Sequence, residues 1–182
     1  MAIYVSMLRG INVGGNKRIK MDALRRSFDA LGFQQVKTFI QSGNVVYKSA
    51  KASTTALSNK IEKRLLEDFG FAVLVVTRTA EEMAGAIKNN SFAAAKGIDQ
   101  EKLHVMFLSA PPAPDALSKL NAWIAEPEQC RCLGRELYLY LPNGAGESKL
   151  LKAPLDRILS VVSTTRNWRT VNSLHQMCQE CR

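Results

Sequence analysis

The stretch best equipped for chemistry is "LRGINVGGNKRIKM" at residues 8–21, between a β-like run and a helix-like run. Its glycines allow positive φ, so that several backbone N–H groups can turn toward one point. Its arginines and lysines add long hydrogen-bond donors. Together these groups could hold a phosphate ahead of the first helix. The residues concerned are Arg9, Asn12, Gly14, Gly15 and Lys17, with Arg18 and Lys20 beside them.

The spacing within this loop matches no established phosphate-binding motif. It is neither the Walker pattern G-x-x-x-x-G-K-[ST] nor the dinucleotide pattern G-x-G-x-x-G. A second interpretation therefore stays open, in which the loop is a long β–α connection whose glycines only satisfy backbone geometry.

Two other polar groups could complete an anion site. The trio Ser42, Gly43 and Asn44 is turn-forming and lies between two β-like runs. The segment "TRNWRT" at residues 165–170 is the second group. If the chain brought these groups beside residues 9–18, they would form one basic cleft.

The segment "TRNWRT" has two interpretations of its own. In the first, Arg166 and Arg169 reach an anion, Asn167 forms a turn and Trp168 stacks on a base. In the second, Trp168 fills the core, Asn167 and Thr170 cap the final helix, and the arginines pair with surface acids.

The charge balance points to anionic partners. The chain of 182 residues carries 25 basic and 16 acidic side chains, a net charge of +9. Such a charge attracts phosphorylated ligands, nucleic acid or an acidic protein. No apolar run approaches the ~20 residues of a membrane span, and the N-terminus has no signal-peptide pattern. We therefore expect a cytoplasmic protein with no membrane association.

The elements that must position these residues follow the order β-α-β-β-α-β. Strand-like runs at 3–8, 36–49 and 72–78 alternate with helical patterns that begin near residues 21 and 54. Both helices end in matching Gly-Phe pairs, "LGF" and "FGF", which suggests two quasi-equivalent halves as in ferredoxin-like folds. The remainder of the chain is a looser copy of the same order.

We therefore predict an α+β fold of two tandem ferredoxin-like units, the C-terminal one less regular. The predicted domains are residues 1–78 and 102–182, with a connecting helix and linker at 79–101. The strand "IYVSML" also resembles the first-strand motif of RNA-recognition domains, but the partner strand offers only Tyr47 for stacking on a base.

Residues for catalysis and metal binding are few. The two histidines, His104 and His175, belong to no recognisable triad, and motifs such as G-x-S-x-G and H-E-x-x-H do not occur. Cys130, Cys132, Cys178 and Cys181 have zinc-like spacing, but they lie in a strand-like and a helix-like run, so free thiols are expected. We expect no metal and no cofactor.

Four stretches together resemble one protein family. They are "LRGINVGGNKRIKM", "LGFQQVKTFIQSGNVVY", "PNGAGESK" and "TTRNWRTVNSL", and they are similar to the bacterial domain of unknown function 1697. The resemblance implies an α+β fold of ferredoxin-like halves, and it lends no catalytic residue. Positions of the family pattern are Arg9, Asn12, Gly14, Gly15, Ser42, Gly43, Asn44, Arg166, Asn167 and Trp168.

From the sequence we expect a module that binds a phosphorylated small molecule or a nucleic-acid backbone in a basic cleft. A small enzyme that uses the same cleft and a basic protein-interaction domain remain the alternatives.

Overall fold

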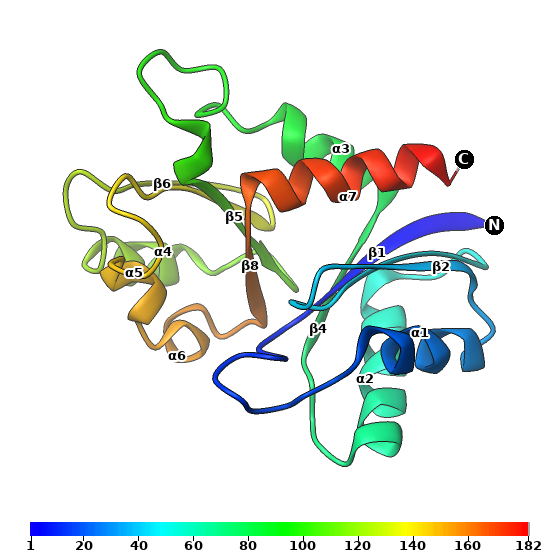
Figure 1. Cartoon of the computed structure of the whole chain (residues 1–182). Helices are drawn as coiled ribbons and strands as arrows, with labels where there is room; N and C mark the ends of the chain where they lie inside the picture. Colours follow the sequence, from blue (N-terminus) through cyan, green and yellow to red (C-terminus); the bar gives the residue numbers. More distant parts are fainter. Residues whose placement is uncertain (182) are drawn as a thin grey trace. The chain divides into compact units, whose positions relative to one another are not determined.

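Two four-stranded antiparallel sheets form the frame of the protein (Figure 1). The structure is a computed structural model and describes residues 1–181. The first sheet has the order β2-β3-β1-β4 and the second the order β6-β7-β5-β8. The strands of the first sheet are β1 (Ala2–Leu8), β2 (Gln34–Phe39), β3 (Asn44–Ser49) and β4 (Val75–Thr79). Those of the second are β5 (Leu103–Leu108), β6 (Gln129–Leu133), β7 (Glu136–Tyr140) and β8 (Ser163–Asn167).

Helices connect the strands in the same order in each half. The first half contains α1 (Met21–Ala30), α2 (Thr54–Phe69) and α3 (Ala80–Lys88). The second contains a 3-10 turn η1 (Gln100–Lys102) and the helices α4 (Pro114–Asn121), α5 (Lys149–Lys152), α6 (Leu155–Leu159) and α7 (Trp168–Glu180). The predicted α+β fold of two ferredoxin-like units is therefore confirmed. The second unit is the less regular one, because Pro154 divides its second connecting helix into α5 and α6.

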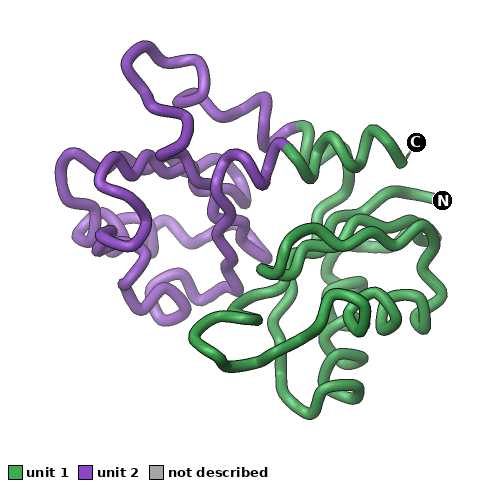
Figure 2. The backbone as a smooth tube through the Cα atoms, viewed as in Figure 1, with its two compact units in different colours: residues 1–84, 173–182 green, residues 85–172 purple. Residues whose placement is uncertain are grey.

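The chain groups into two compact units, residues 1–84 with 173–182, and residues 85–172 (Figure 2). The chain leaves the first unit within α3 and returns to it within α7. The predicted division into residues 1–78, a connecting segment at 79–101 and residues 102–182 remains a prediction. Within residues 1–181, no helix combines the length and hydropathy required to cross a bilayer.

The Gly-Phe pairs end the first two helices as predicted. Gly32 follows α1 with φ of +79°, and Gly70 caps α2 with φ of +75°, a conformation that glycine adopts without a Cβ penalty. Phe33 then packs on Phe28, with ring centroids 5.9 Å apart. At its other end α2 is capped by Ser53, whose hydroxyl accepts a hydrogen bond from the Ala56 N–H at 3.2 Å.

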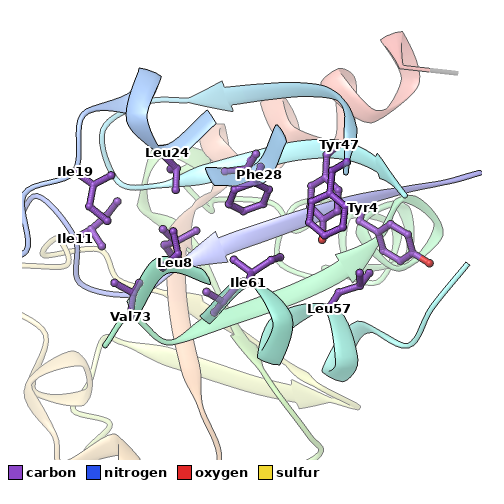
Figure 3. Packing of buried hydrophobic residues seen from close by; sticks show 14 residues of the cluster. Tyr4, Leu8, Ile11, Ile19, Leu24, Phe28, Tyr47, Leu57, Ile61 and Val73 are labelled. Atoms are coloured by element: carbon purple, nitrogen blue, oxygen red, sulfur yellow. The ribbon is translucent and has the colours of Figure 1, made fainter. Parts of the chain in front are cut away.

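The core of the first unit lies between its sheet and the helices α1 and α2 (Figure 3). Tyr47 belongs to this core, stacked on Phe33 with centroids 4.4 Å apart and in edge contact with Phe28 at 5.3 Å. Its hydroxyl contacts Ser6 at 3.0 Å, and burial raises the pKa of this phenol. Tyr47 is fully buried, so it is not available to stack on a base as the RNA-recognition interpretation would need.

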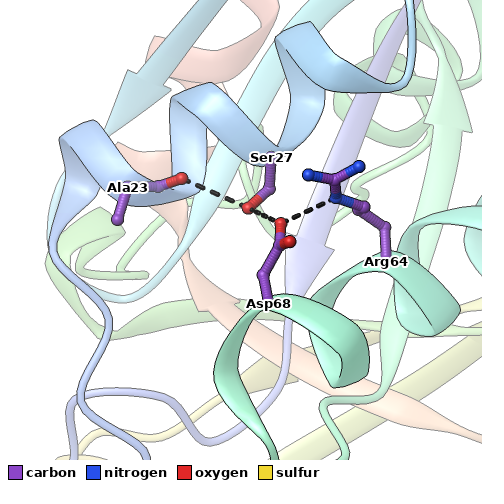
Figure 4. A network of polar contacts seen from close by, with 4 residues as sticks. All are labelled: Ala23, Ser27, Arg64 and Asp68. Carbon is purple, nitrogen blue, oxygen red and sulfur yellow. Dashed lines mark hydrogen bonds and ion pairs between the residues drawn. The ribbon is translucent and has the colours of Figure 1, made fainter.

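A short polar network joins α1 to α2 (Figure 4). Ser27 donates to Asp68 Oδ2 at 2.6 Å, and the same oxygen accepts from Arg64 Nε at 2.8 Å. These two donors hold the pKa of Asp68 below its usual range, because each stabilises the charged carboxylate. The network links α1 to α2, the two helices that cover the sheet.

Each unit has a buried arginine at the same register position of its sheet. Val5 in β1 is opposite Arg78 in β4, and Val105 in β5 is opposite Arg166 in β8. Both arginines are buried, although arginine is among the residues least often found inside proteins. The agreement supports the relation between the halves that the sequence suggested.

Candidate functional site

The loop before α1 folds into a small hairpin. Asn12 N–H donates to Lys17 O at 3.2 Å, and Asn16 N–H donates to Val13 O at 3.1 Å. Gly14 and Gly15, at the tip, have φ of +59° and +81°. A two-residue hairpin turn of type I′ requires positive φ at both central positions. The two glycines therefore satisfy turn geometry, as the second interpretation of this loop proposed.

Asn12 ties this hairpin to the turn that precedes β3. Its Nδ2 donates to Ile19 O at 3.0 Å and to Gln41 O at 2.8 Å, while its Oδ1 accepts from Ile19 N–H at 2.9 Å. Both amide hydrogens are used in these contacts. Asn12 thus holds two loops together, and neither of its donors points to an outside ligand.

The trio Ser42, Gly43 and Asn44 forms the other side of this junction. Gly43 has φ of +78°, and a Cβ at this position would lie 2.6 Å from Ile11 Cδ1 and 3.0 Å from Leu8 Cβ. Asn44 is fully buried, and its Nδ2 donates to Phe39 O at 3.1 Å and to Ser42 Oγ at 3.0 Å. These contacts show how the trio shapes the turn. Its predicted part in ligand binding remains a prediction.

Between the two loops lies an open hollow of about 560 Å³, here called the α1 hollow. Its lining residues are Asn12, Gly15, Arg18, Ile19, Lys20, Met21 and Gln41. Two of them are cations, and no acidic side chain of the described chain belongs to the lining. The charged side chains that line the α1 hollow are therefore both positive.

The first turn of α1 adds to this polarity. Lys20 is the N-cap residue, and its side chain makes no capping hydrogen bond. The first N–H groups of a helix and its dipole favour a negative charge at this end. Asp22 lies in the same turn, where its carboxylate is 3.4 Å from Arg25.

The cations predicted for the loop take different positions. Lys17 Nζ donates to Ala72 O at 2.7 Å, so its charge lies against the segment that follows α2. Arg9 is half-buried, and its backbone N–H donates to Leu74 O at 2.9 Å. Arg18 and Lys20 are exposed and line the hollow, and within the described chain neither forms an ion pair with an acid.

The segment "TRNWRT" lies in the second unit and surrounds the start of α7. Asn167 Oδ1 accepts from Thr170 N–H at 2.8 Å, so Asn167 is the cap and the expectation that Thr170 caps the helix is wrong. Thr170 falls in the third helical position, where its N–H needs an acceptor. Arg166 is buried, and not on the surface beside acids as one interpretation had it.

Arg166 is held by its own strand. Its guanidinium donates to Thr164 Oγ1 at 2.8 Å and to Thr165 O at 2.9 Å, and desolvation lowers its pKa to about 10. Trp168 is also largely buried, yet it lines a second hollow of about 490 Å³, called the α7 hollow. The remaining lining residues of that hollow are Gln100, Glu101, Asn167, Arg169 and Asn172.

Two of the three predicted groups contribute lining residues to a hollow within their own unit, and the trio Ser42, Gly43 and Asn44 lines neither hollow. Asn12 and Gly15 line the α1 hollow, whereas Asn167, Trp168 and Arg169 line the α7 hollow. Glu101 gives the α7 hollow a mixed charge, unlike the first.

The cysteines and histidines give no metal site. None of the four cysteines forms a disulfide, and within residues 1–181 no three His, Cys, Asp or Glu side chains are grouped to hold a metal ion. Burial raises the pKa of the Cys130 thiol to about 12, with Cys132 nearby as a second cause. Burial also lowers the pKa of His104.

Comparison with known proteins now gives the family. The model of the family described as "Protein of unknown function (DUF1697)" matches residues 1–138. The chain belongs to this DUF1697 family. The resemblance stated from the motifs is confirmed, although "PNGAGESK" and "TTRNWRTVNSL" lie beyond the matched residues.

A solved structure shares the fold of this DUF1697 protein. The conserved bacterial protein SP0830 from Streptococcus pneumoniae superposes with a TM-score of 0.77 at 23% sequence identity. The superposition covers 97% of this chain and 98% of that one. At 23% sequence identity, this structural similarity establishes the shared fold alone. No curated protein matches the chain.

Three residues that line the α1 hollow, Arg18, Lys20 and Gln41, are absent from the site residues predicted first from the sequence. The sequence shows the basic run "NKRIK", but a run of basic residues does not by itself indicate which of their side chains line a concave surface. Gln41 had no signal, because it reaches the α1 hollow through a contact between two loops 29 residues apart.

Proposed function

We propose that this DUF1697 protein binds a phosphorylated ligand in the α1 hollow. The observation that carries the proposal is a concave surface lined by Arg18 and Lys20 without an acidic side chain from the described residues. A phosphate group there would gain two charge-assisted contacts and the favourable field of the start of α1.

The scaffold around the α1 hollow is suited to hold these cations in place. Ile19 lies between Arg18 and Lys20 in the sequence. The side chain of Asn12 hydrogen-bonds both the backbone N–H and the backbone carbonyl group of Ile19. Ile19 is itself buried in the core of the first unit. The backbone between Arg18 and Lys20 is therefore anchored, which lowers the conformational entropy lost when a ligand binds.

The net charge of +9 supports the same conclusion at longer range. A positive field raises the local concentration of anions and speeds their association at low salt. The predicted contribution of Asn167, Trp168 and Arg169 to ligand binding is a separate part of this proposal, in which the α7 hollow of the second unit would bind an anion by itself. The predicted contribution of Arg166 to ligand binding remains a prediction.

Thermal denaturation at about 50 mM salt tests the proposal. Pyrophosphate, mononucleotides and oligonucleotides are each added to the wild type and to the double variant Arg18→Ala/Lys20→Ala. A ligand present at 100 times its Kd adds about 2.7 kcal/mol of stability, which raises Tm by roughly 5–10 °C in a chain of this size. The double variant is expected to lose this shift.

The matched control is Lys51→Ala/Lys63→Ala, which removes the same charge from exposed positions outside the α1 hollow. This control is expected to keep most of the stabilisation. If no phosphorylated compound stabilises the wild type, or if both double variants respond alike, the α1 hollow is not the binding site.

A further inference from the structure

Two aliphatic side chains are exposed on the loops that form the α1 hollow. Val13 is 65% exposed at the hairpin tip, and Ile40 is 49% exposed in the turn before β3. Their neighbours Asn12 and Gln41 share a hydrogen bond of 2.8 Å, so the two loops are joined at this point. Val13 and Ile40 are therefore each next in sequence to one partner of this bond, and both partners line the α1 hollow.

The backbone at both tips is held in a specific conformation. Ile40 has φ of +49°, although a β-branched residue in this region is strained. The Gly14-Gly15 turn fixes Val13 on the other loop. Strained residues persist where the surroundings determine them, and they gather at ligand-contacting segments. Ile40 thus combines this backbone conformation with an apolar side chain that is half exposed to solvent.

A ligand that matches this surface must present negative charge and an apolar face close together. Arg18 and Lys20 would contact the charge, while Val13 and Ile40 would contact the apolar face. Single-stranded nucleic acid has this pattern, because each nucleotide carries a phosphate and an unpaired base with an open face. A duplex hides these faces within its stack.

We infer that the α1 hollow binds single-stranded nucleic acid, with a phosphate at Arg18 and Lys20 and adjacent bases packed on Val13 and Ile40. This inference rests on the proposed function, and it adds the class of ligand. An anionic membrane fits less well, because two short side chains form a much smaller apolar face than interfacial anchors have. An acidic protein would leave the aliphatic pair unexplained.

The test measures fluorescence anisotropy of a labelled 12-nucleotide RNA and DNA of mixed sequence, each single-stranded and as a duplex. The variant is Val13→Thr/Ile40→Asn. Threonine keeps the β-branched shape of valine, and asparagine tolerates positive φ, so both changes remove apolar surface without disturbing the backbone. We expect single-strand affinity to fall at least about fivefold, because each aliphatic side chain would bury apolar surface against a base.

The matched control is Leu66→Gln, which removes an aliphatic side chain that is also 49% exposed but lies on α2. It is expected to bind as the wild type does. Duplex affinity should be weaker than single-strand affinity and should not respond to Val13→Thr/Ile40→Asn. Melting curves of all variants report whether the fold is kept.

The outcomes separate this inference from the proposed function. If Arg18→Ala/Lys20→Ala abolishes binding while Val13→Thr/Ile40→Asn binds single strands normally, the base contact is wrong and the phosphate site stands. Preference for duplex, or binding to phosphatidylserine vesicles but not to single strands, also overturns the inference. If Arg18→Ala/Lys20→Ala binds every probe like the wild type, the proposed function fails as well.

Discussion

Replacement of Gly43 by alanine should destabilise the first unit far more than the same change at Gly14. A Cβ at Gly43 would lie 2.6 Å from Ile11 Cδ1 and 3.0 Å from Leu8 Cβ, which is closer than van der Waals contact allows. Both neighbours are fully buried, so they have little room to move. Gly14 has no atom within 4 Å of the corresponding position.

The magnitude follows from two separate terms. Both glycines have positive φ, and alanine in that conformation costs about 1–2 kcal/mol. Only Gly43 adds overpacking, which costs typically about 1–3 kcal/mol in a close-packed core. We therefore expect Gly43→Ala to lower the free energy of unfolding by about 2–5 kcal/mol, and Gly14→Ala by about 1–2 kcal/mol.

Urea denaturation followed by circular dichroism measures both values, provided that the slope with denaturant stays the same among the variants. The assay is run without ligand, so that a binding role of either glycine does not enter. Equal losses for the two variants would show that Ile11 and Leu8 move aside, and that close packing is not the reason for glycine at position 43.

Three further predictions test single contacts. Asn12→Asp keeps the size and the acceptor but loses both donors, so the free energy of unfolding, measured by urea denaturation at pH 7, should fall by about 1–3 kcal/mol. A variant as stable as the wild type at that pH would contradict this prediction. Asp68 has a lowered pKa, so its stabilisation is present above its usual pKa of about 4 and is lost as pH falls through the lowered value. Asp68→Asn should therefore show a shallower loss of stability between about pH 4 and 2, measured by urea midpoints. Cys130 is partly buried and has a pKa raised to about 12, so it should react with a thiol reagent at pH 8 much more slowly than in urea; equal rates would show that its surroundings do not protect it.

Much of the local structure could be predicted from residue patterns. The helix stops at Gly32 and Gly70, and the break at Pro154, follow from backbone chemistry that acts within a few residues. The paired β-α-β-β-α-β order follows from alternation and helical spacing, which also need no distant contact. The prediction that Thr170 caps α7 is wrong by about one helical turn. Asn167 and Thr170 are both good cap residues, and the residue at which α7 begins decides between them.

The sequence by itself determined the elements, their order and the excess of positive charge, because propensity, periodicity and charge are properties of neighbouring residues. Only the tertiary structure decided that Asn12 braces two loops, that Gly43 is needed against Ile11, and that Arg18 and Lys20 line a hollow while Lys17 does not. The physical reason is that a side chain's role depends on the atoms that face it. Those atoms come from segments tens of residues away, such as Gln41 opposite Asn12 and Ala72 opposite Lys17.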